Sequence, residues 1–285
     1  MNSFPTGFWM QLSGTIGKPR KLTSNVLQPD YSRVQLTFWW PGGSPDLRLV
    51  LGGNAGAMVS FWLVNPLTKK LRESPLLARA APFVLFLCIT ALQGQLGEAS
   101  RYWLYLAKTI VGIGLVWMMY PLVTEMRWAF SWEAVVVGVG VCVMWVGIDG
   151  FYPKLGKGGG PWNPHAQFGQ DSTLAWVFIV GRILGSTIIV PPLEEVFYRS
   201  FLYRYFIKPE FQLVSLGTFQ GLAFVMTAVI FGFSHYEWLA GILCGFAYQG
   251  LVLWKKRLGD AMTAHAITNF LLGLWIVWKG AWHFW

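Results

Sequence analysis

The chain has 285 residues, of which 54% are hydrophobic and only 12% are charged. Because an ordinary soluble domain carries about 25% charged residues, this composition excludes one and indicates a membrane protein. The formal net charge is +9, yet the basic residues are scattered through short loops between apolar segments. Positive-inside loops explain that pattern better than a nucleic-acid surface does, so we expect the lipid bilayer as a partner and no nucleic acid.

Residues 1–74 differ in composition from the rest of the chain. They contain several glycines, prolines and basic residues, and their apolar stretch at 57–64 is too short to cross a bilayer core, which needs about 20 residues. We predict a weakly structured N-terminal arm or a misassigned start over residues 1–74, followed by one helical intramembrane domain over residues 75–285.

Long apolar runs dominate the chain after this arm. They cover about 76–93, 102–123, 132–149, 174–190, 192–206, 213–233, 237–254 and 261–278. Runs of this length predict transmembrane helices, some of them half-length or broken. Tryptophans at many of the run ends match the aromatic belts of membrane interfaces. The expected fold is an all-α, polytopic transmembrane bundle of about 6–8 helices.

Basic clusters predict how this bundle is oriented. Several lysines and arginines lie at 69–79, before the first run, and three more lie at 255–257, between the last two runs. The positive-inside rule places both clusters in the cytoplasm. The polar loop at 150–173 is then expected on the opposite side of the membrane.

The apolar stretch at 174–206 is interrupted by Pro191 and Pro192. Since proline removes a helical hydrogen bond and clashes with the preceding turn, we predict a break there and a new helix that starts at the prolines. That helix would carry Glu194 and Glu195 in its first turn. Broken backbone at membrane depth survives only where it is buried in protein or lines a wet cavity, so the break points to a site.

Two adjacent carboxylates in an apolar segment are costly and mark a functional site by default. Glu195 and Arg199 are four residues apart and can form an ion pair on one helix face, whereas Glu194 points about 100° away. We therefore predict a structural Glu195 and a chemically available Glu194. The alternative is that both acids are capping charges favoured by the helix dipole.

Two later apolar segments carry histidines at membrane depth. Phe231 and His235 are four residues apart at the end of one run, and His265 and Asn269 share one helix face in the last run. Taken alone, His235 fits an interfacial histidine, and the second pair fits hydrogen bonding between packed helices. Because polar groups on separate apolar segments each need partners in a low-dielectric bundle, we predict that they meet at one site.

Three motifs occur in order, each in its own apolar segment: Glu194-Glu195-x-x-x-Arg199, Phe231-x-x-x-His235 and His265-x-x-x-Asn269. Together they resemble the motifs of the CAAX-processing and bacteriocin-immunity family of intramembrane proteases, which is related to the CAAX prenyl proteases. The resemblance covers roughly residues 76–278 and implies a helical bundle with a membrane-embedded active-site cavity.

The resemblance also implies roles for these residues. Glu194 and His235 are implied to activate a water molecule, while His265 and Asn269 hold the negative charge that develops on the substrate carbonyl. The implied supporting residues are Glu195, Arg199 and Phe231. A zinc ion bound by Glu194, His235 and His265 is the alternative. Because the chain has no His-Glu-x-x-His helix, we expect metal-independent hydrolysis without a cofactor.

The expected function is that of an intramembrane endopeptidase. Its partner would be a membrane protein or a lipidated peptide, and the sequence leaves open whether the substrate is prenylated or cut near its C-terminus. A likeness to the family's bacterial branch, associated with protein sorting, implies a multi-pass protein of the bacterial inner (plasma) membrane. One alternative is a non-catalytic immunity or scaffold protein that binds a partner in the same cavity.

A transporter with the acids as a proton relay is disfavoured, because the chain shows no internal repeat and few charges on its other spans. Arg182 is the chief exception among those charges. We expect its side chain to face the cavity or pair with a carboxylate, with plain packing or snorkelling as the alternative.

Simple alternation of full spans conflicts with a shared site. If the runs at 213–233 and 261–278 both start in the cytoplasm, His235 lies near the opposite membrane face from His265, since a 20-residue helix spans about 30 Å. Either one of the two helices is short or broken, or the number of crossings differs by one.

Overall fold

The computed structural model describes residues 10–13, 34–38, 47–51, 66–155 and 160–285. The chain divides into two compact units, Met1–Ser74 and Pro75–Trp285. Much of the first unit lies outside the described residues, so the expectation of a weakly structured arm or a misassigned start stays a prediction.

The described part of the first unit contains a small sheet and one helix. Strands β1 (Met10–Ser13), β2 (Val34–Phe38) and β3 (Leu47–Leu51) pair antiparallel in the order β1-β2-β3. In this register Leu36 lies between Leu12 and Leu49. The alternating apolar and polar residues of β2 are typical of a strand with one apolar face. Helix α2 covers Pro66–Glu73.

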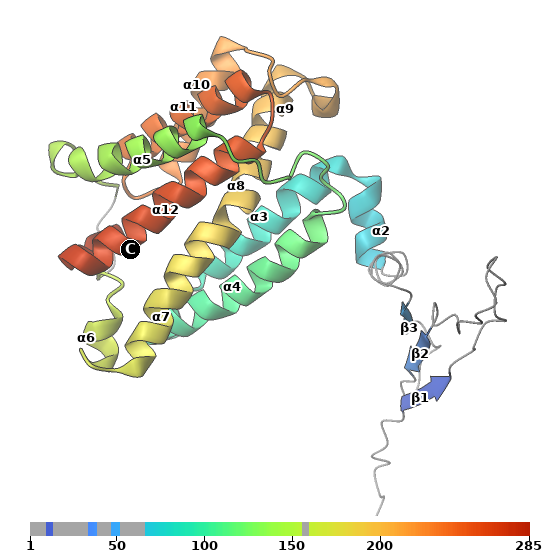
Figure 1. Cartoon of the computed structure of the whole chain (residues 1–285), viewed down its shortest axis with the longest axis horizontal. Helices are drawn as coiled ribbons and strands as arrows, with labels where there is room; N and C mark the ends of the chain where they lie inside the picture. Colours follow the sequence, from blue (N-terminus) through green and yellow to red (C-terminus); the bar gives the residue numbers. More distant parts are fainter. Residues whose placement is uncertain (1–9, 14–33, 39–46, 52–65, 156–159) are drawn as a thin grey trace, which may run out of the picture. The chain divides into compact units, whose positions relative to one another are not determined.

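The described part of the second unit is helical throughout and contains no strand. Its α-helices are α3 (Pro75–Ala91), α4 (Ser100–Met119), α5 (Trp132–Gly147), α6 (Pro164–Phe168), α7 (Thr173–Leu184), α8 (Val190–Glu195), α9 (Tyr203–Ile207), α10 (Gly221–Phe233), α11 (Trp238–Lys255) and α12 (Gly259–Lys279). In Figure 1, α3, α4 and α7 lie side by side on one side of α12, and α5, α10 and α11 lie on the other.

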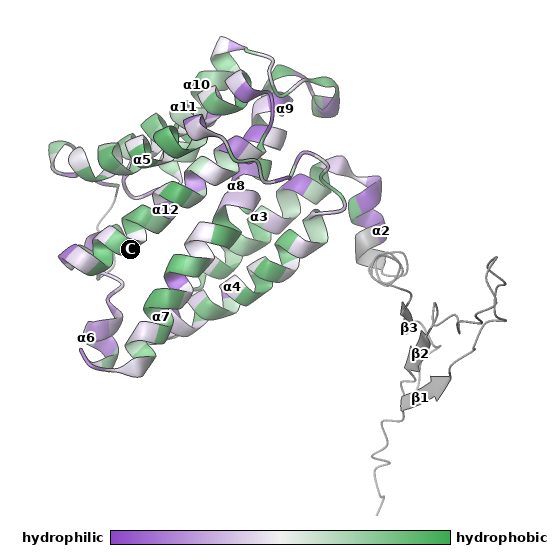
Figure 2. Ribbon diagram, in the orientation of Figure 1, coloured by the Kyte–Doolittle hydropathy of each residue, from purple (hydrophilic) through white to green (hydrophobic). Residues whose placement is uncertain are grey.

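Three helices of the described residues are long and apolar enough to cross a membrane: Ser100–Met119, Thr173–Ile207 and Gly259–Lys279. Hydrophobic residues predominate along these helices in Figure 2. Large apolar side chains such as Ile110 and Val143 are 69% and 67% exposed, which water would penalise and lipid would not. The predicted helical membrane bundle is confirmed.

Helices α7, α8 and α9 form one continuous helix, so the break predicted at the two prolines is wrong. Two π-helical segments, η2 (Gly185–Ile189) and η3 (Val196–Leu202), join them. A π turn bonds each N–H to the carbonyl five residues back, which changes the spacing of the carbonyls around Pro191 and Pro192 and lets the helix pass through residues that lack an N–H. Glu194 and Glu195 therefore lie in the middle of a long helix.

Helices α10 and α11 form a short, tightly packed hairpin. Helix α10 has only 13 residues, or about 20 Å of helix, against a bilayer core of about 30 Å. Small residues allow the two helices to touch: a Cβ on Gly241 would lie 2.9 Å from Gly232 Cα, and one on Gly245 would lie 2.9 Å from Ala228 Cα. The turn that carries His235 thus follows a helix too short to span the membrane, which resolves the conflict over full spans.

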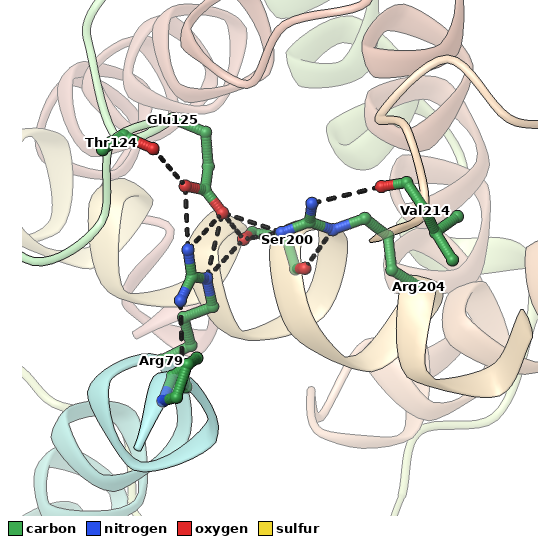
Figure 3. Close-up of polar contacts among 7 residues, drawn as sticks. Arg79, Thr124, Glu125, Ser200, Arg204 and Val214 are labelled. Atoms are coloured by element: carbon green, nitrogen blue, oxygen red, sulfur yellow. Dashed lines mark hydrogen bonds and ion pairs between the residues drawn. The ribbon is translucent and has the colours of Figure 1, made fainter. Parts of the chain in front are cut away.

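A buried ion cluster fastens the loop after α4 to two other helices (Figure 3). Glu125 accepts hydrogen bonds from Arg79 on α3, with both nitrogen–oxygen distances 2.9 Å, and from Arg204 on α9 at 2.7 Å. The Ser200 hydroxyl donates to the same carboxylate. We call these four residues the Glu125 cluster. Arg79 is therefore a buried structural residue as well as a member of the basic cluster at 69–79.

The same loop lies beside the second basic cluster. Lys255 Nζ is 3.1 Å from Glu133 Oε1, at the start of α5, and a Cβ on Gly259 would lie 2.5 Å from Ala129 N. Arg79 and Lys255 thus approach the same connection between α4 and α5, as expected if both lie at one membrane face. The assignment of that face to the cytoplasm stays a prediction.

Candidate active site

One cavity of about 480 Å³ collects polar side chains from three parts of the bundle. The residues predicted to be catalytic all line it: Glu194, His235, His265 and Asn269. Glu194 comes from α8, His235 from the turn after α10, and the other two from α12. The cavity therefore joins three segments that are distant in the sequence.

Glu194 is a carboxylate of this cavity with one oxygen that lacks a hydrogen-bond donor among the described residues. Its side chain is 15% exposed, and its Oε2 lies 4.0 Å from His265 Nε2. This oxygen is buried and accepts no hydrogen bond from the residues that the structure describes. A buried carboxylate oxygen without a donor is costly and is therefore typical of a functional group.

Glu195 differs from Glu194 because each of its oxygens lies close to a charged or polar partner, although its Oε2 accepts no hydrogen bond from the described residues. Its side chain is fully buried, its Oε2 lies 3.2 Å from Arg199 Nε, and its Oε1 lies 2.8 Å from His265 Nδ1. The ion pair with Arg199 is the one expected from the four-residue spacing. The bond to His265 was not foreseen, although a carboxylate with two oxygens always has a second one to satisfy.

Arg199 packs behind the carboxylate pair and is fully buried. Its guanidinium lies 4.2 Å from the centroid of the Phe231 ring and 5.7 Å from that of Tyr248. The aromatic faces and Glu195 together stabilise the buried positive charge. Phe231 thus supports the site through contacts on both of its sides, since its ring also lies 4.7 Å from that of His235.

The backbone of α10 selects the tautomer of His235. The His235 Nδ1 atom lies 2.8 Å from the carbonyl oxygen of Phe231. Because a carbonyl oxygen only accepts hydrogen bonds, Nδ1 carries the hydrogen. Nε2 is then left with a lone pair. In this tautomer Nε2 can accept a hydrogen bond from water.

Helix α12 positions the remaining two residues. Asn269 Nδ2 donates to the carbonyl oxygen of Ser186 at 2.9 Å, within the π-helical segment η2. One amide hydrogen of Asn269 is left for another acceptor. The helix approaches α5 closely at this level, since a Cβ on Gly138 would lie 2.6 Å from Ala264 O. This contact fixes the height of His265 in the bundle.

Two cations that line the cavity complete its wall. Lys108 of α4 was not singled out in the sequence, although a lysine inside an apolar run is itself a signal of a site. Arg182 was expected to face the cavity or to pair with a carboxylate. It lines the cavity, but it forms no ion pair with a carboxylate of the described residues. Its guanidinium lies among the rings of Trp162, Tyr105 and Trp285, at 4.5, 4.8 and 5.2 Å.

A metal site was the alternative for Glu194, His235 and His265. Over the described ranges, no three His, Cys, Asp or Glu side chains are arranged to hold a metal ion. The chemistry of the cavity is therefore derived from its side chains alone, and the expectation of a metal-independent reaction stays a prediction.

Comparisons with known proteins agree with the family resemblance that the three motifs indicate. Residues 175–271 match the family described as "Rce1-like: Type II CAAX prenyl endopeptidase Rce1-like". No curated protein and no solved structure matches the chain. The matched residues include Glu194, Glu195, His235, His265 and Asn269. The resemblance to CAAX-processing proteases is thereby confirmed over residues 175–271, which match this family of proteases.

Proposed function

We propose that the chain is an intramembrane endopeptidase that hydrolyses a peptide bond of a membrane-associated protein with a water molecule activated by Glu194 and His235. The observation that carries this proposal is the meeting of four polar side chains in one cavity, with a buried Glu194 oxygen that has no hydrogen-bond donor among the described residues.

Glu194 is the general base of this mechanism. Water donates one hydrogen bond to Glu194 and another to the lone pair of His235 Nε2, which orients its oxygen toward the substrate carbonyl. As the oxygen attacks the carbonyl carbon, its proton passes to Glu194. The carbon–nitrogen bond then breaks, and Glu194 returns the proton to the leaving nitrogen. The products are a carboxylate and an amine.

His265 and Asn269 stabilise the oxyanion that forms after water attacks the carbonyl carbon and before the carbon–nitrogen bond breaks. His265 acts as an imidazolium whose Nδ1–H donates to Glu195, at 2.8 Å, and whose Nε2–H is directed into the cavity. Asn269 contributes the amide hydrogen that Ser186 does not use. Preorganised donors of this kind stabilise a developing negative charge strongly in a dry site.

The membrane setting restricts the substrate. Because the bundle exposes apolar faces to lipid, a substrate reaches the cavity from the bilayer, as a membrane protein or a lipidated peptide. We also propose that the chain is a multi-pass protein, with the bacterial inner membrane as its location. Three helices long and apolar enough to cross a membrane support the first statement, and the second rests on the likeness of the motifs to the family's bacterial branch.

Glu194→Ala tests the activity directly. Cells that express the full-length protein or this variant are compared by mass spectrometry of the C-termini of their membrane proteins, with Glu210→Ala as a control that removes an exposed carboxylate. We expect cleaved C-termini with the wild type and the control, and a loss of about 1,000-fold with Glu194→Ala. Cleavage retained by a folded Glu194→Ala variant would refute the proposed mechanism, and the absence of cleaved C-termini with the wild type would favour a non-catalytic binding protein.

A further inference from the structure

The ring of Tyr248, on α11, covers one face of the His265 imidazole. The two ring centroids are 5.1 Å apart and the planes are inclined by 29°, which is a stacked arrangement. Tyr248 is fully buried, His265 is almost so, and both side chains line the cavity. Tyr248 therefore contacts one of the groups of the proposed reaction, although it belongs to none of the three motifs.

The other contacts of His265 leave its ring one freedom of motion. Its Cβ is fixed to α12, and its Nδ1 lies 2.8 Å from Glu195 Oε1. A ring held at these two points can still rock about the line that joins them, and this motion displaces Nε2, the atom directed into the cavity. The Phe231 ring is farther away, at 6.3 Å, and nearly perpendicular. The stacked Tyr248 ring blocks the rocking, because a tilt of the imidazole would bring the two close-packed faces into steric conflict.

Two consecutive hydrogen bonds fix Tyr248 in turn. The Tyr248 hydroxyl donates to Thr268 Oγ1 at 2.7 Å, and Thr268 Oγ1 donates to the carbonyl oxygen of Gly138 at 2.8 Å. Thr268 lies on α12, three residues after His265, and Gly138 lies on α5. Both bonds are buried, so bulk water does not replace a lost partner. Tyr248 is thereby tied to the helix that carries His265 and to the contact between α5 and α12.

We propose that Tyr248, anchored through Thr268, is a positioning residue that holds the plane of the His265 imidazole so that Nε2–H is aimed at the oxygen of the substrate carbonyl. This inference rests on the proposed peptidase function and extends its machinery beyond the three motifs. Tyr248 acts through His265 and not on the reacting atoms. Because an oxyanion donor stabilises the transition state most when its direction is fixed beforehand, a mobile ring slows the chemical step and leaves substrate binding unchanged.

Motion of the His265 ring tests this assignment without any substrate. The full-length protein is produced with isotope-labelled histidine and reconstituted in phosphatidylcholine bilayers, and solid-state NMR measures the order parameter of the Cε1–H bond of each histidine. His265→Gln identifies the signal of His265. We expect an order parameter above about 0.8 in the wild type and below about 0.6 in Tyr248→Leu. An equally rigid ring in Tyr248→Leu would overturn the proposal.

Phe246→Leu is the matched control for lost packing. Phe246 lies on the same helix as Tyr248 and stacks on Phe224 at 5.2 Å, but it does not line the cavity. We expect this variant to keep the wild-type order parameter of His265. A loss of order in Phe246→Leu equal to that in Tyr248→Leu would assign the effect to general helix packing and overturn the inference.

Two milder variants test the anchor and replace Tyr248→Leu if that variant does not fold. Tyr248→Phe keeps the stacked ring without its hydroxyl, and Thr268→Val removes the acceptor of the same hydrogen bond. We expect both to give order parameters between those of the wild type and Tyr248→Leu. The double variant should be no more mobile than either single one, because both remove one shared bond. Wild-type order in both single variants would contradict the anchored arrangement.

Cleavage kinetics show whether the positioning serves the reaction. The substrate is a fluorogenic peptide that spans a cleavage site found by the mass-spectrometric comparison described above. We expect Tyr248→Leu to lower kcat about 100-fold at an unchanged KM, as for a misplaced donor, and Tyr248→Phe to lower it about fivefold. A rise in KM at an unchanged kcat would overturn the positioning role. A wild type that cleaves nothing refutes the peptidase function, whereas the order parameters decide separately whether Tyr248 holds the ring.

Discussion

The Glu125 cluster and the active-site cavity both bury a carboxylate among cations, but they treat it in opposite ways. Glu125 receives hydrogen bonds on both oxygens, from Arg79, Arg204 and Ser200 (Figure 3). Glu194 has a buried oxygen that accepts none from the described residues. The protein donates hydrogen bonds to both oxygens of Glu125, whereas Glu194 retains an oxygen that can accept a hydrogen bond from water or substrate.

The difference shows how one bundle uses the same residue types for stability and for chemistry. A buried charge with complete hydrogen bonding holds helices together, and its removal leaves its partners uncompensated. A carboxylate without donors contributes little to stability and retains its basicity. Beside the cavity, Glu195 lies between the two types: one oxygen is hydrogen-bonded to His265, while the other forms an ion pair with Arg199 but accepts no hydrogen bond from the described residues.

Neutralising the two carboxylates separately is expected to produce the largest contrast. Glu125→Gln leaves Arg79 and Arg204 buried without a counter-ion, so we expect the free energy of unfolding to fall by about 3 kcal/mol. Glu194→Gln should change it by less than about 1 kcal/mol, because no protein donor is lost. Denaturant titration of the purified full-length protein in detergent measures both. A similar loss for both variants would erase the proposed distinction.

Acid should weaken the Glu125 cluster by a smaller, graded amount. Burial alone would raise the pKa of Glu125, but Arg79 and the Ser200 hydrogen bond lower it below the ordinary value of 4.5. A carboxylate whose pKa is lower in the folded protein adds stability above its unfolded pKa and loses it as the pH falls through the folded pKa. We expect wild-type unfolding midpoints to fall more between pH 6 and pH 3 than those of Glu125→Gln.

The control for this pH effect is the variant itself. Glu125→Gln cannot titrate at this position, so the difference between its pH profile and that of the wild type isolates the contribution of the cluster. Parallel profiles over the whole range would show that Glu125 is not held in its charged form by the two arginines.

Metal removal is expected to have the smallest effect. If Glu194 and His235 activate water by themselves, overnight dialysis against EDTA followed by assay with 1,10-phenanthroline should leave peptidase activity within about twofold of the untreated protein. The untreated sample and a known zinc protease provide the reference. Loss of activity that zinc restores would instead assign Glu194, His235 and His265 to a metal.

Several features of the site could be predicted from the sequence because they depend on short spacings. The four-residue interval between Glu195 and Arg199 places both side chains on one helix face, and the structure has that ion pair. The same reasoning placed His265 and Asn269 on one face of α12. The meeting of Glu194, His235, His265 and Asn269 in one cavity followed from the cost of isolated polar groups in an apolar bundle.

Predictions made from single segments failed where the backbone conformation or the packing between helices decides the outcome. The prolines at 191 and 192 predicted a break, but π-helical turns on both sides keep the helix continuous through Thr173–Ile207. Lys108 and the hydrogen bond from His265 to Glu195 were missed, because each depends on which helix lies opposite. No spacing within one segment carries that information.

The sequence by itself determined the membrane class, the positions of the apolar helices and the three motifs, since these follow from composition and from the period of a helix. Only the tertiary structure decided how the motifs meet. Helix α10 is too short to span a bilayer, and its glycine-lined contact with α11 holds His235 at the cavity with Glu194 and His265. The depth of His235 in the membrane depends on packing between helices. The order of residues along one helix does not specify this packing.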